Sequence, residues 1–202
     1  MISIKSEREI ELMRIAGSIV GDTHKYLQKY IKPGITTAEL DELAYNYIIS
    51  RNATPSFKGY EGFPGTICAS INEEVVHGIP GKTKLREGDI ISIDIGACYK
   101  GYHGDSAWTY PVGKISKQKQ DLLKHTEESL FAGLSVIKEG ARIGDIGYAV
   151  SSVANKYHLG VVKELVGHGV GTSVHEAPDV PNYGKQNNGP VLKAGMVIAV
   201  EP

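Results

Sequence analysis

The chain has 202 residues, of which 41% are hydrophobic, and a formal net charge of −1 at pH 7. This composition suffices to bury the core of one globular domain, and the near-neutral charge without a basic stretch gives no signal for direct nucleic-acid binding. No apolar run approaches the roughly 20 residues of a membrane-spanning helix, the polar first residues are unlike a signal peptide, and the cysteines are too few for a disulfide scaffold. We therefore expect a cytoplasmic protein without membrane attachment.

Two helices are predicted at the start of the chain. Ser6 and Glu9 have the spacing of a capping box, and apolar residues at helical spacing follow as far as a Pro-Gly stop at residues 33–34. Thr36 and Glu39 repeat the capping pattern. They are predicted to open a second helix.

Strands are predicted to dominate from Thr66 to Val112, after an ordered loop at residues 52–65 that is rich in glycine, proline and aromatic residues. The alternating isoleucines at positions 91, 93 and 95 share one face of a strand, which places Asp94 on the opposite face. An acid on so apolar a strand is costly to bury unless a cation or hydrogen-bond donors compensate it. The ordinary alternative is an edge-strand acid that faces water.

A second acid follows soon after the first. If Lys100-Gly101 forms the two-residue turn of a β-hairpin, Asp94 lies opposite Ala107, and Asp105 is its diagonal neighbour on the same face. Such positions lie roughly 7–8 Å apart, which suits two carboxylates that reach a pair of metal ions. A bulge near the turn would instead move Asp105 to the other face. An aspartic-protease dyad needs the same two acids, but the chain has no Asp-Thr-Gly signature.

The second half of the chain repeats the plan of the first. Helices are predicted at about residues 122–137 and 145–157, followed by glycine-rich turns and strands. A decamer that ends in Asp94 also aligns without a gap on one that ends in Glu201, 107 positions later. We expect the alternation of apolar residues to continue in this second copy, with Glu201 on the face opposite to them.

The repeat predicts how the domain is organised. We expect one catalytic domain spanning residues 1–202, with half-repeats at about 6–112 and 116–202. Each half has two helices followed by sheet, which indicates an α+β fold with helices layered on one side of an antiparallel sheet and a pseudo-twofold axis. We expect four side chains to converge where the two halves join: Asp94, Asp105, His168 and Glu201.

Three histidines lie among glycines and small residues: His77, His168 and His175. Imidazole is a common metal ligand and general acid near neutral pH, although a single histidine is more often structural. Together with the three acids above, these histidines form an oxygen-rich set suited to Mn, Fe, Co or Zn. The other histidines have no comparable setting and are interpreted as surface or packing residues: His24, His103, His125 and His158.

Six segments carry a family resemblance, in order along nearly the whole chain: Cys68 to Pro80, Gly88 to Asp94, Gly101 to Asp105, Gly167 to Gly171, His175 to Pro178, and Glu201-Pro202. They resemble type I methionine aminopeptidase. The resemblance implies the pita-bread (creatinase/aminopeptidase) fold, in which two pseudo-twofold-related halves place helices over a curved antiparallel sheet. It also implies metal-dependent hydrolysis that removes the initiator methionine from nascent proteins with a small second residue.

The resemblance implies roles for individual residues. Asp94, Asp105, His168 and Glu201 would bind two divalent metal ions, drawn from Co, Mn, Fe and Zn. Glu201 would also accept a proton from the attacking water. His77 and His175 would be catalytic residues that contact the scissile amide and its carbonyl oxygen. Tyr60, Phe63 and Cys68 would line the methionine pocket, a role that suits soft and aromatic surfaces, although ordinary packing explains such residues equally well.

The sequence leaves other interpretations open. A proline-specific (Xaa-Pro) aminopeptidase uses the same ligand set but normally carries a large domain before the catalytic half. A non-catalytic peptide-binding module has the same fold but usually loses ligands, and an inactive fragment is a third alternative. In the family a further strand supplies a final metal-bridging glutamate, whereas this sequence stops at Pro202. We therefore expect weakened binding of the second metal and impaired activity.

The resemblance also implies the partners of the protein. Nascent peptide N-termini are the expected substrates, reached through a transient association with the ribosome. We expect a monomer that does not bind nucleic acid directly.

Overall fold

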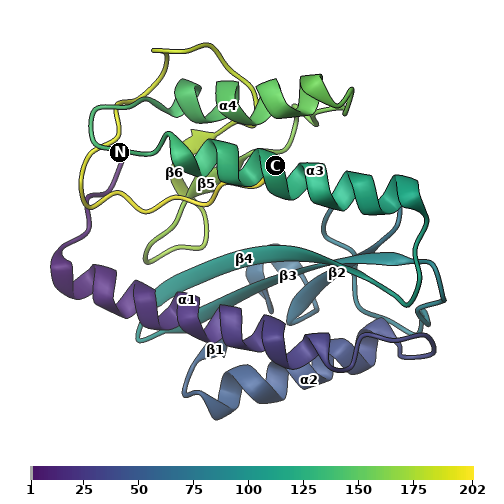
Figure 1. Cartoon of the computed structure of the whole chain (residues 1–202). Coiled ribbons are helices and arrows are strands. Elements are labelled where there is room, and N and C mark those ends of the chain that lie inside the picture. Colours follow the sequence, from purple (N-terminus) through teal and green to yellow (C-terminus); the bar gives the residue numbers. More distant parts are fainter. Residues whose placement is uncertain (1) are drawn as a thin grey trace. The chain divides into compact units, whose positions relative to one another are not determined.

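The computed structural model describes residues 2–202 and separates into two units (Figure 1). Unit 1 consists of Met1–Ile10 and Gln118–Pro202, and unit 2 of Glu11–Lys117. Helix α1 (Glu7–Gln28) begins in unit 1 and continues through unit 2. Its predicted capping box is confirmed, because the Ser6 amide donates to Glu9 Oε2 at 2.7 Å and the Glu9 amide donates to Ser6 Oγ at 3.4 Å.

Helix α1 ends earlier than the predicted Pro-Gly stop. The Tyr30 amide donates to the Leu27 carbonyl at 2.8 Å, a bond between residues three apart that tightens the chain into a turn. The second predicted helix is α2 (Thr37–Ser50), and Thr36 with Glu39 forms its capping box.

Unit 2 is organised around the central strand β3 (Ile90–Tyr99). Strand β4 (Tyr102–Pro111) pairs with one edge of β3, while β2 (Ile67–Ile71) and the short β1 (Thr54–Pro55) pair with the other edge, all of them antiparallel. The 3-10 helix η1 (Tyr60–Gly62) lies in the connection from β1 to β2. The predicted strand region is thus two long strands and a shorter one, with an irregular connection between β2 and β3.

The core of unit 2 lies between this sheet and helices α1 and α2 (Figure 1). Its buried members include Leu27, Leu40, Ile48, Ile91, Ile93 and Ile95. Tyr26 of α1 stacks on Tyr47 of α2 with ring centroids 4.8 Å apart. Gly104 of β4 permits close packing of α1, because a Cβ at this position would lie 2.5 Å from the backbone nitrogen of Gly17.

The turn between β3 and β4 sets the register of the hairpin. Lys100 and Gly101 both have positive φ, 50° and 85°, as a type I′ turn requires. The ladder runs without a register shift, so that Asp94 pairs with Ala107 and Gly96 with Asp105. The register predicted from the two-residue turn is therefore confirmed.

Unit 1 contains α3 (Lys117–Ser135) from its second residue onward, α4 (Ile143–Lys156) and a two-stranded sheet of β5 (Gly167–Gly169) and β6 (Glu176–Val180). Both helices occur close to their predicted positions. The buried core of this unit is formed by Ile143, Ile146, Val150, Val180 and Leu192.

The sequence repeat is accompanied by repeated hydrogen bonds within each unit. Helices α2 and α4 both have 14 residues. The Gly34 amide donates to the Leu85 carbonyl at 2.8 Å, and the equivalent Gly140 amide donates to the Leu192 carbonyl at 3.0 Å. Both glycines have positive φ, 96° and 86°. The same local connection, between the turn after a helix and the first residue of a decamer, is therefore built twice.

The second copy of the repeated decamer is not a regular strand, contrary to the expectation from its alternation. The segment makes one isolated bridge, between Ile198 and Gly169, and the Ala199 amide donates to the His168 carbonyl at 2.7 Å. Its partner β5 has only three residues. A partner of this length limits how far the ladder extends.

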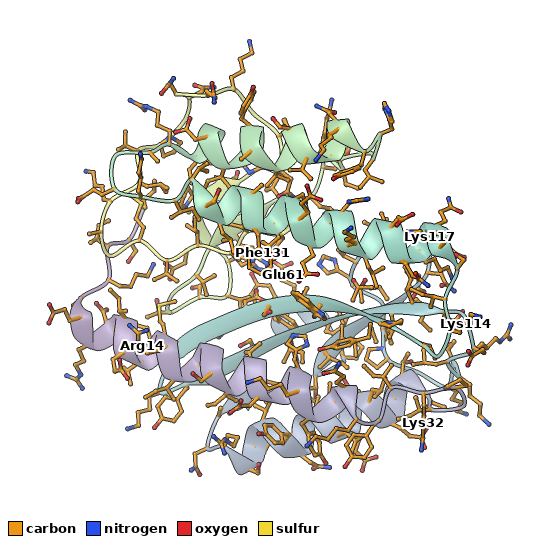
Figure 2. The ribbon with its side chains drawn as sticks, viewed as in Figure 1. Arg14, Lys32, Glu61, Lys114, Lys117 and Phe131 are labelled. Carbon is orange, nitrogen blue, oxygen red and sulfur yellow. The ribbon has the colours of Figure 1, made fainter. Side chains whose placement is uncertain are left out.

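The exposed sides of the helices carry charged residues (Figure 2). Arg14 of α1, labelled in Figure 2, pairs with Glu11 at 3.2 Å, and both side chains are well exposed. Among the described residues, none of the helices has the length and apolar character needed to cross a membrane.

Candidate metal centre

Two acids lie on one face of the β3–β4 hairpin in unit 2. Because Asp94 pairs with Ala107 and Asp105 pairs with Gly96, the two acids are diagonal neighbours on the face opposite to the isoleucine core. Both are partly buried. Unit 2 therefore presents two carboxylates in the relationship that the sequence predicts.

Cys68 is directly opposite Asp94 on the neighbouring strand β2. Burial, followed by the negative charges of Asp94, Asp105 and Asp41, raises the pKa of this thiol to about 12. Asp41 also accepts the Thr66 and Ile67 amides at 2.6 and 2.9 Å, which fixes the start of β2. Cys68 thus remains a neutral thiol near neutral pH, suited to a pocket wall and unsuited to act as a thiolate ligand.

His103 also lies on this face of the hairpin, where its contacts are those of a packing residue, as the sequence predicts. It pairs with Cys98 across the hairpin, and its Nδ1 lies 2.8 Å from Ser56 Oγ. The Ser56 amide in turn donates to the Gly96 carbonyl at 2.9 Å. The register places His103 two positions from Asp105 on one strand, so both side chains share a face of the hairpin.

The remaining predicted ligands lie together in unit 1. His168 Nε2 is 3.2 Å from Glu201 Oε1, and the imidazole is buried whereas the carboxylate is partly exposed. In the antiparallel register set by the bridge between Gly169 and Ile198, His168 lies opposite Ala199, and Glu201 is two residues further along the same segment. His168 and Glu201 are therefore diagonal neighbours on adjacent extended segments. Unit 1 therefore also presents a diagonal pair of ligand-type side chains.

The glycines around His168 are required by close backbone contacts. A Cβ at Gly167 would lie 2.3 Å from the Ala199 carbonyl oxygen, and one at Gly169 would lie 2.4 Å from the Ala177 carbonyl oxygen. Side chains at these positions would separate the segments that hold His168 beside Glu201. This explains the Gly-His-Gly sequence.

The contact between His168 and Glu201 has the chemistry of a metal site. His168 Nδ1 lies 2.8 Å from the Gly169 carbonyl, which can only accept a hydrogen bond, so Nδ1 is the donor. The Nε2 lone pair then faces a carboxylate oxygen, an arrangement that requires a proton or a cation between the two atoms. Two ligand atoms at about 2.0–2.2 Å from one ion lie roughly 3 Å apart, which agrees with the observed 3.2 Å. These residues therefore fit a divalent metal.

Two other predicted residues occupy loops. The His175 ring lies beside His168, with ring centroids 4.1 Å apart, at the end of a loop in unit 1. His77 is an exposed residue of unit 2 with a positive φ of 59°. It precedes Gly78, whose carbonyl accepts the Ala69 amide of β2 at 2.8 Å. His77 is thus held at the edge of the strand that carries Cys68.

The aromatic residues predicted for the methionine pocket belong to η1 and the residue after it. Tyr60 is 37% exposed, and Phe63 is partly buried. The Phe63 carbonyl accepts the Gly59 amide at 2.8 Å, which closes this short turn. The described contacts place both aromatic residues and Cys68 in unit 2 without joining them into one cluster.

Each unit contributes two of the four predicted metal ligands. Within either unit, residues 2–202 contain no group of three or more His, Cys, Asp or Glu side chains placed to hold a metal ion. Asp94 and Asp105 belong to unit 2, and His168 and Glu201 belong to unit 1.

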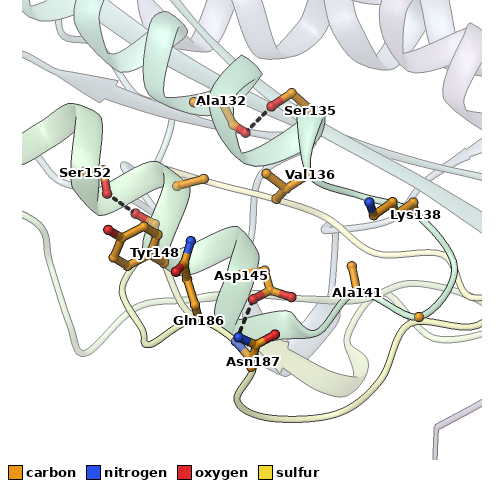
Figure 3. Close-up of a pocket in the computed structure, with 12 residues that line it drawn as sticks. Ala132, Ser135, Val136, Lys138, Ala141, Asp145, Tyr148, Ser152, Gln186 and Asn187 are labelled. Atoms are coloured by element: carbon orange, nitrogen blue, oxygen red, sulfur yellow. Dashed lines mark hydrogen bonds between the residues drawn. The ribbon is translucent and has the colours of Figure 1, made fainter.

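A separate hollow of about 740 Å³ lies beside α3 and α4 in unit 1 (Figure 3). Asp145 in this hollow accepts the Asn187 amide at 2.7 Å, and hydrogen bonds from the Asn187 and Arg142 amides lower the pKa of its carboxyl group. None of the predicted site residues lines the hollow. Its polar groups stabilise the start of α4.

Comparison with known proteins gives matches along the whole chain. Methionine aminopeptidase 1 of Bacillus subtilis (strain 168) is 56% identical over 202 residues, which cover 100% of this chain and 82% of that protein. The crystal structure of methionine aminopeptidase from Rickettsia prowazekii has a TM-score of 0.97 and 40% identity, and the match covers 99% of this chain and 81% of that one. Prolidase from Pyrococcus furiosus has a TM-score of 0.84 at 23% identity, over 98% of this chain and 56% of that one. This last likeness concerns the fold alone.

The model of metallopeptidase family M24 matches residues 11–202. The expected α+β pita-bread fold is confirmed by the structural neighbours and by the mixture of helices and antiparallel sheet. The family match extends over nearly the whole chain, and the two methionine aminopeptidases named above are matched over more than two thirds of their own length. The chain therefore belongs to metallopeptidase family M24.

Proposed function

We propose that the protein is a methionine aminopeptidase, which removes the N-terminal methionine from nascent proteins whose second residue is small. The observation that carries the proposal is the diagonal pairing of ligand-type side chains in both units, Asp94 with Asp105 and His168 with Glu201. Identity of 56% to a methionine aminopeptidase, over the whole of this chain and 82% of that protein, supports the choice of substrate.

Two divalent metal ions are the proposed cofactors, held by Asp94, Asp105, His168 and Glu201. The predominance of carboxylate oxygens with one imidazole suits Mn, Co, Fe or Zn. When bound, such ions supply a Lewis acid that polarises the scissile carbonyl and acidifies water.

The protein's own side chains then position the substrate and move protons. Glu201 accepts a proton from the attacking water, as a carboxylate within hydrogen-bond reach can do. His175 donates to the carbonyl oxygen as negative charge develops there, and His77 contacts the scissile amide. Tyr60, Phe63 and the neutral thiol of Cys68 form the surface against which the methionine thioether packs.

The proposed setting is the cytoplasm, where nascent chains emerge. The substrate is the free amino terminus of such a chain, reached during a transient association with the ribosome. We propose that the protein works as a monomer.

Release of methionine from a Met-Ala-Ser peptide tests this function. The protein is treated with a chelator and then assayed with and without added Mn or Co, beside an Ala-Pro-Ala peptide and a Met-Lys-Ser peptide. We expect metal-dependent cleavage of Met-Ala-Ser, slower cleavage of Met-Lys-Ser and no cleavage of Ala-Pro-Ala. Preferred cleavage of Ala-Pro-Ala would instead identify a proline-specific peptidase, and binding without turnover would identify a peptide-binding module.

A further inference from the structure

A buried ion pair connects the first described residues with the loop that carries His175. Lys5 Nζ lies 2.8 Å from Glu176 Oε2, and the two side chains are 3% and 17% exposed. Lys5, His175 and Glu176 all belong to unit 1. The mechanism proposed above uses neither member of the pair.

Glu176 closes the loop at residues 171–176 on itself. Its Oε1 accepts the Ser173 amide at 3.2 Å and the Thr172 hydroxyl at 3.4 Å. A Cβ at Gly171 would lie 2.4 Å from the same oxygen, so a side chain there would have to displace the Glu176 carboxylate. Since His175 directly precedes Glu176, the carboxylate fixes the backbone from which the His175 ring extends.

The charge state of Glu176 agrees with this role. Burial alone would raise the pKa of its carboxyl group, but the Lys5 ammonium and the Ser173 amide lower the pKa below its usual value. Both oxygens of the carboxylate therefore remain acceptors, one for Lys5 and one for the loop.

The backbone of Lys5 is fixed independently of its side chain. The Lys5 amide donates to the Gly195 carbonyl at 2.8 Å. Gly195 has a φ of 88°, and a Cβ there would lie 2.8 Å from the Lys5 carbonyl oxygen. Lys5 thus joins the turn that leads to Glu201 with the loop that ends in His175.

Stability alone does not explain a buried pair of this kind. Taking two charges out of water offsets much of their attraction, so well-packed apolar residues would stabilise the same place at least as well. An ion pair differs from an apolar contact because it fixes the direction of the carboxylate, and with it the loop that the carboxylate closes.

We propose that Lys5 is a positioning residue for His175, acting through Glu176. The proposal rests on the proposed function, in which His175 donates to the substrate carbonyl. Lys5 holds the loop so that the His175 ring keeps one orientation beside His168, from which the ring centroid is 4.1 Å away.

The test compares Lys5→Met, Lys5→Arg and the control Lys193→Met, which removes an exposed lysine of the same unit. In metal-loaded protein, we expect Lys5→Met to lower kcat for Met-Ala-Ser by about 10–100-fold, the range found when supporting partners of an active site are lost, with KM changed by less than about twofold. Lys5→Arg should restore most of kcat, and Lys193→Met should leave it unchanged. An unchanged kcat in Lys5→Met would overturn the proposal.

A double-mutant cycle separates positioning from general destabilisation. In a His175→Ala background, Lys5→Met should cause little further loss, because the group that it positions is absent. An equal further loss would contradict the proposed role. If His175→Ala alone leaves turnover unchanged, the role of His175 in the proposed function fails instead.

Amide hydrogen exchange tests the contact without turnover. In Lys5→Met, and in Glu176→Gln as a second variant, amides of residues 171–176 should exchange at least about tenfold faster while those of β3 and β4 keep their wild-type rates. Unchanged exchange in the loop would refute the positioning role of Lys5, even in a protein that releases methionine normally. Loss of protection throughout the chain in both variants would likewise refute it, since the pair would then serve folding as a whole.

Discussion

Cys68 lies directly opposite Asp94 on neighbouring antiparallel strands, and its thiol is buried beside the two acids of the hairpin. Burial, followed by the charges of Asp94 and Asp105, raises the pKa of Cys68 to about 12. The free thiol of Cys98 is less buried.

Alkylation should therefore distinguish the two cysteines. At pH 8 the folded protein is expected to react with iodoacetamide at Cys98 at least about tenfold faster than at Cys68, because only a thiolate attacks and a buried, high-pKa thiol supplies very little of it. Peptide mass spectrometry over a time course gives both rates. In denaturant the two rates should become similar, and faster labelling of Cys68 in the folded protein would contradict the burial and pKa described for it.

Asp105→Ala should remove metal-dependent turnover. The substitution deletes one of the two carboxylates on the hairpin face, and even the loss of an outer-shell partner costs a metal site about 10–100-fold. We expect at least a 100-fold fall in the rate on Met-Ala-Ser and a reduced metal content by elemental analysis. Glu11→Ala, which removes a well-exposed acid, is the matched control. Wild-type rates in Asp105→Ala would disprove the ligand assignment.

Two glycine substitutions should have opposite effects on stability. Gly104→Ala introduces a Cβ within 2.5 Å of the Gly17 backbone and should destabilise the protein by about 1–3 kcal/mol. Gly21→Ala in α1 meets no atom within 4 Å and should stabilise the helix by about 0.5–1 kcal/mol. Urea unfolding followed by the fluorescence of Trp108 measures both changes, because Trp108 is the only tryptophan. Equal effects of the two substitutions would contradict the close packing of α1 on β4.

His24 should make stability fall in mild acid. Its Nδ1 lies 3.0 Å from the Tyr110 hydroxyl and its Nε2 lies 2.8 Å from the Ser106 carbonyl. Burial lowers the pKa of His24 below 6.5, although the Ser106 carbonyl and the charge of Asp105 act in the opposite direction. Between the folded pKa and 6.5 the unfolded chain binds more protons than the folded chain, so stability is fully present above 6.5 and is lost as the pH falls through this window.

The slope due to His24 cannot exceed about 1.4 kcal/mol per pH unit, the value for one proton. The measurement compares urea unfolding at pH 7.5 and pH 5.5 for the wild-type protein and for His24→Gln. The variant should be less stable at pH 7.5 and should lose less stability on acidification. His158→Asn, at an exposed residue with positive φ, is the control and should keep the wild-type pH dependence.

Turn and capping patterns in the sequence predicted the parts of the fold that depend on residues close together in the chain. The two-residue turn at Lys100-Gly101 determines which residues of the hairpin pair, so the shared face of Asp94 and Asp105 followed from the sequence. Capping patterns likewise predicted the starts of α1 and α2. Each of these signals acts within a few residues or across one turn.

Other features depend on contacts that periodicity does not encode. Lys5 and Glu176 are distant in sequence, and only the folded chain brings their charges together. The second decamer has the same alternation as the first, but β5 offers it too short a partner to form a regular strand.

The tip of the β3–β4 hairpin has a practical consequence for engineering. Side chains alternate between the two faces, so an inserted residue that slips the pairing by one position would turn Asp105 towards the isoleucines of the core. Grafted epitopes or fluorophores are therefore better attached at exposed helix positions, and a library that varies Lys100 should keep Gly101 and the length of the tip constant.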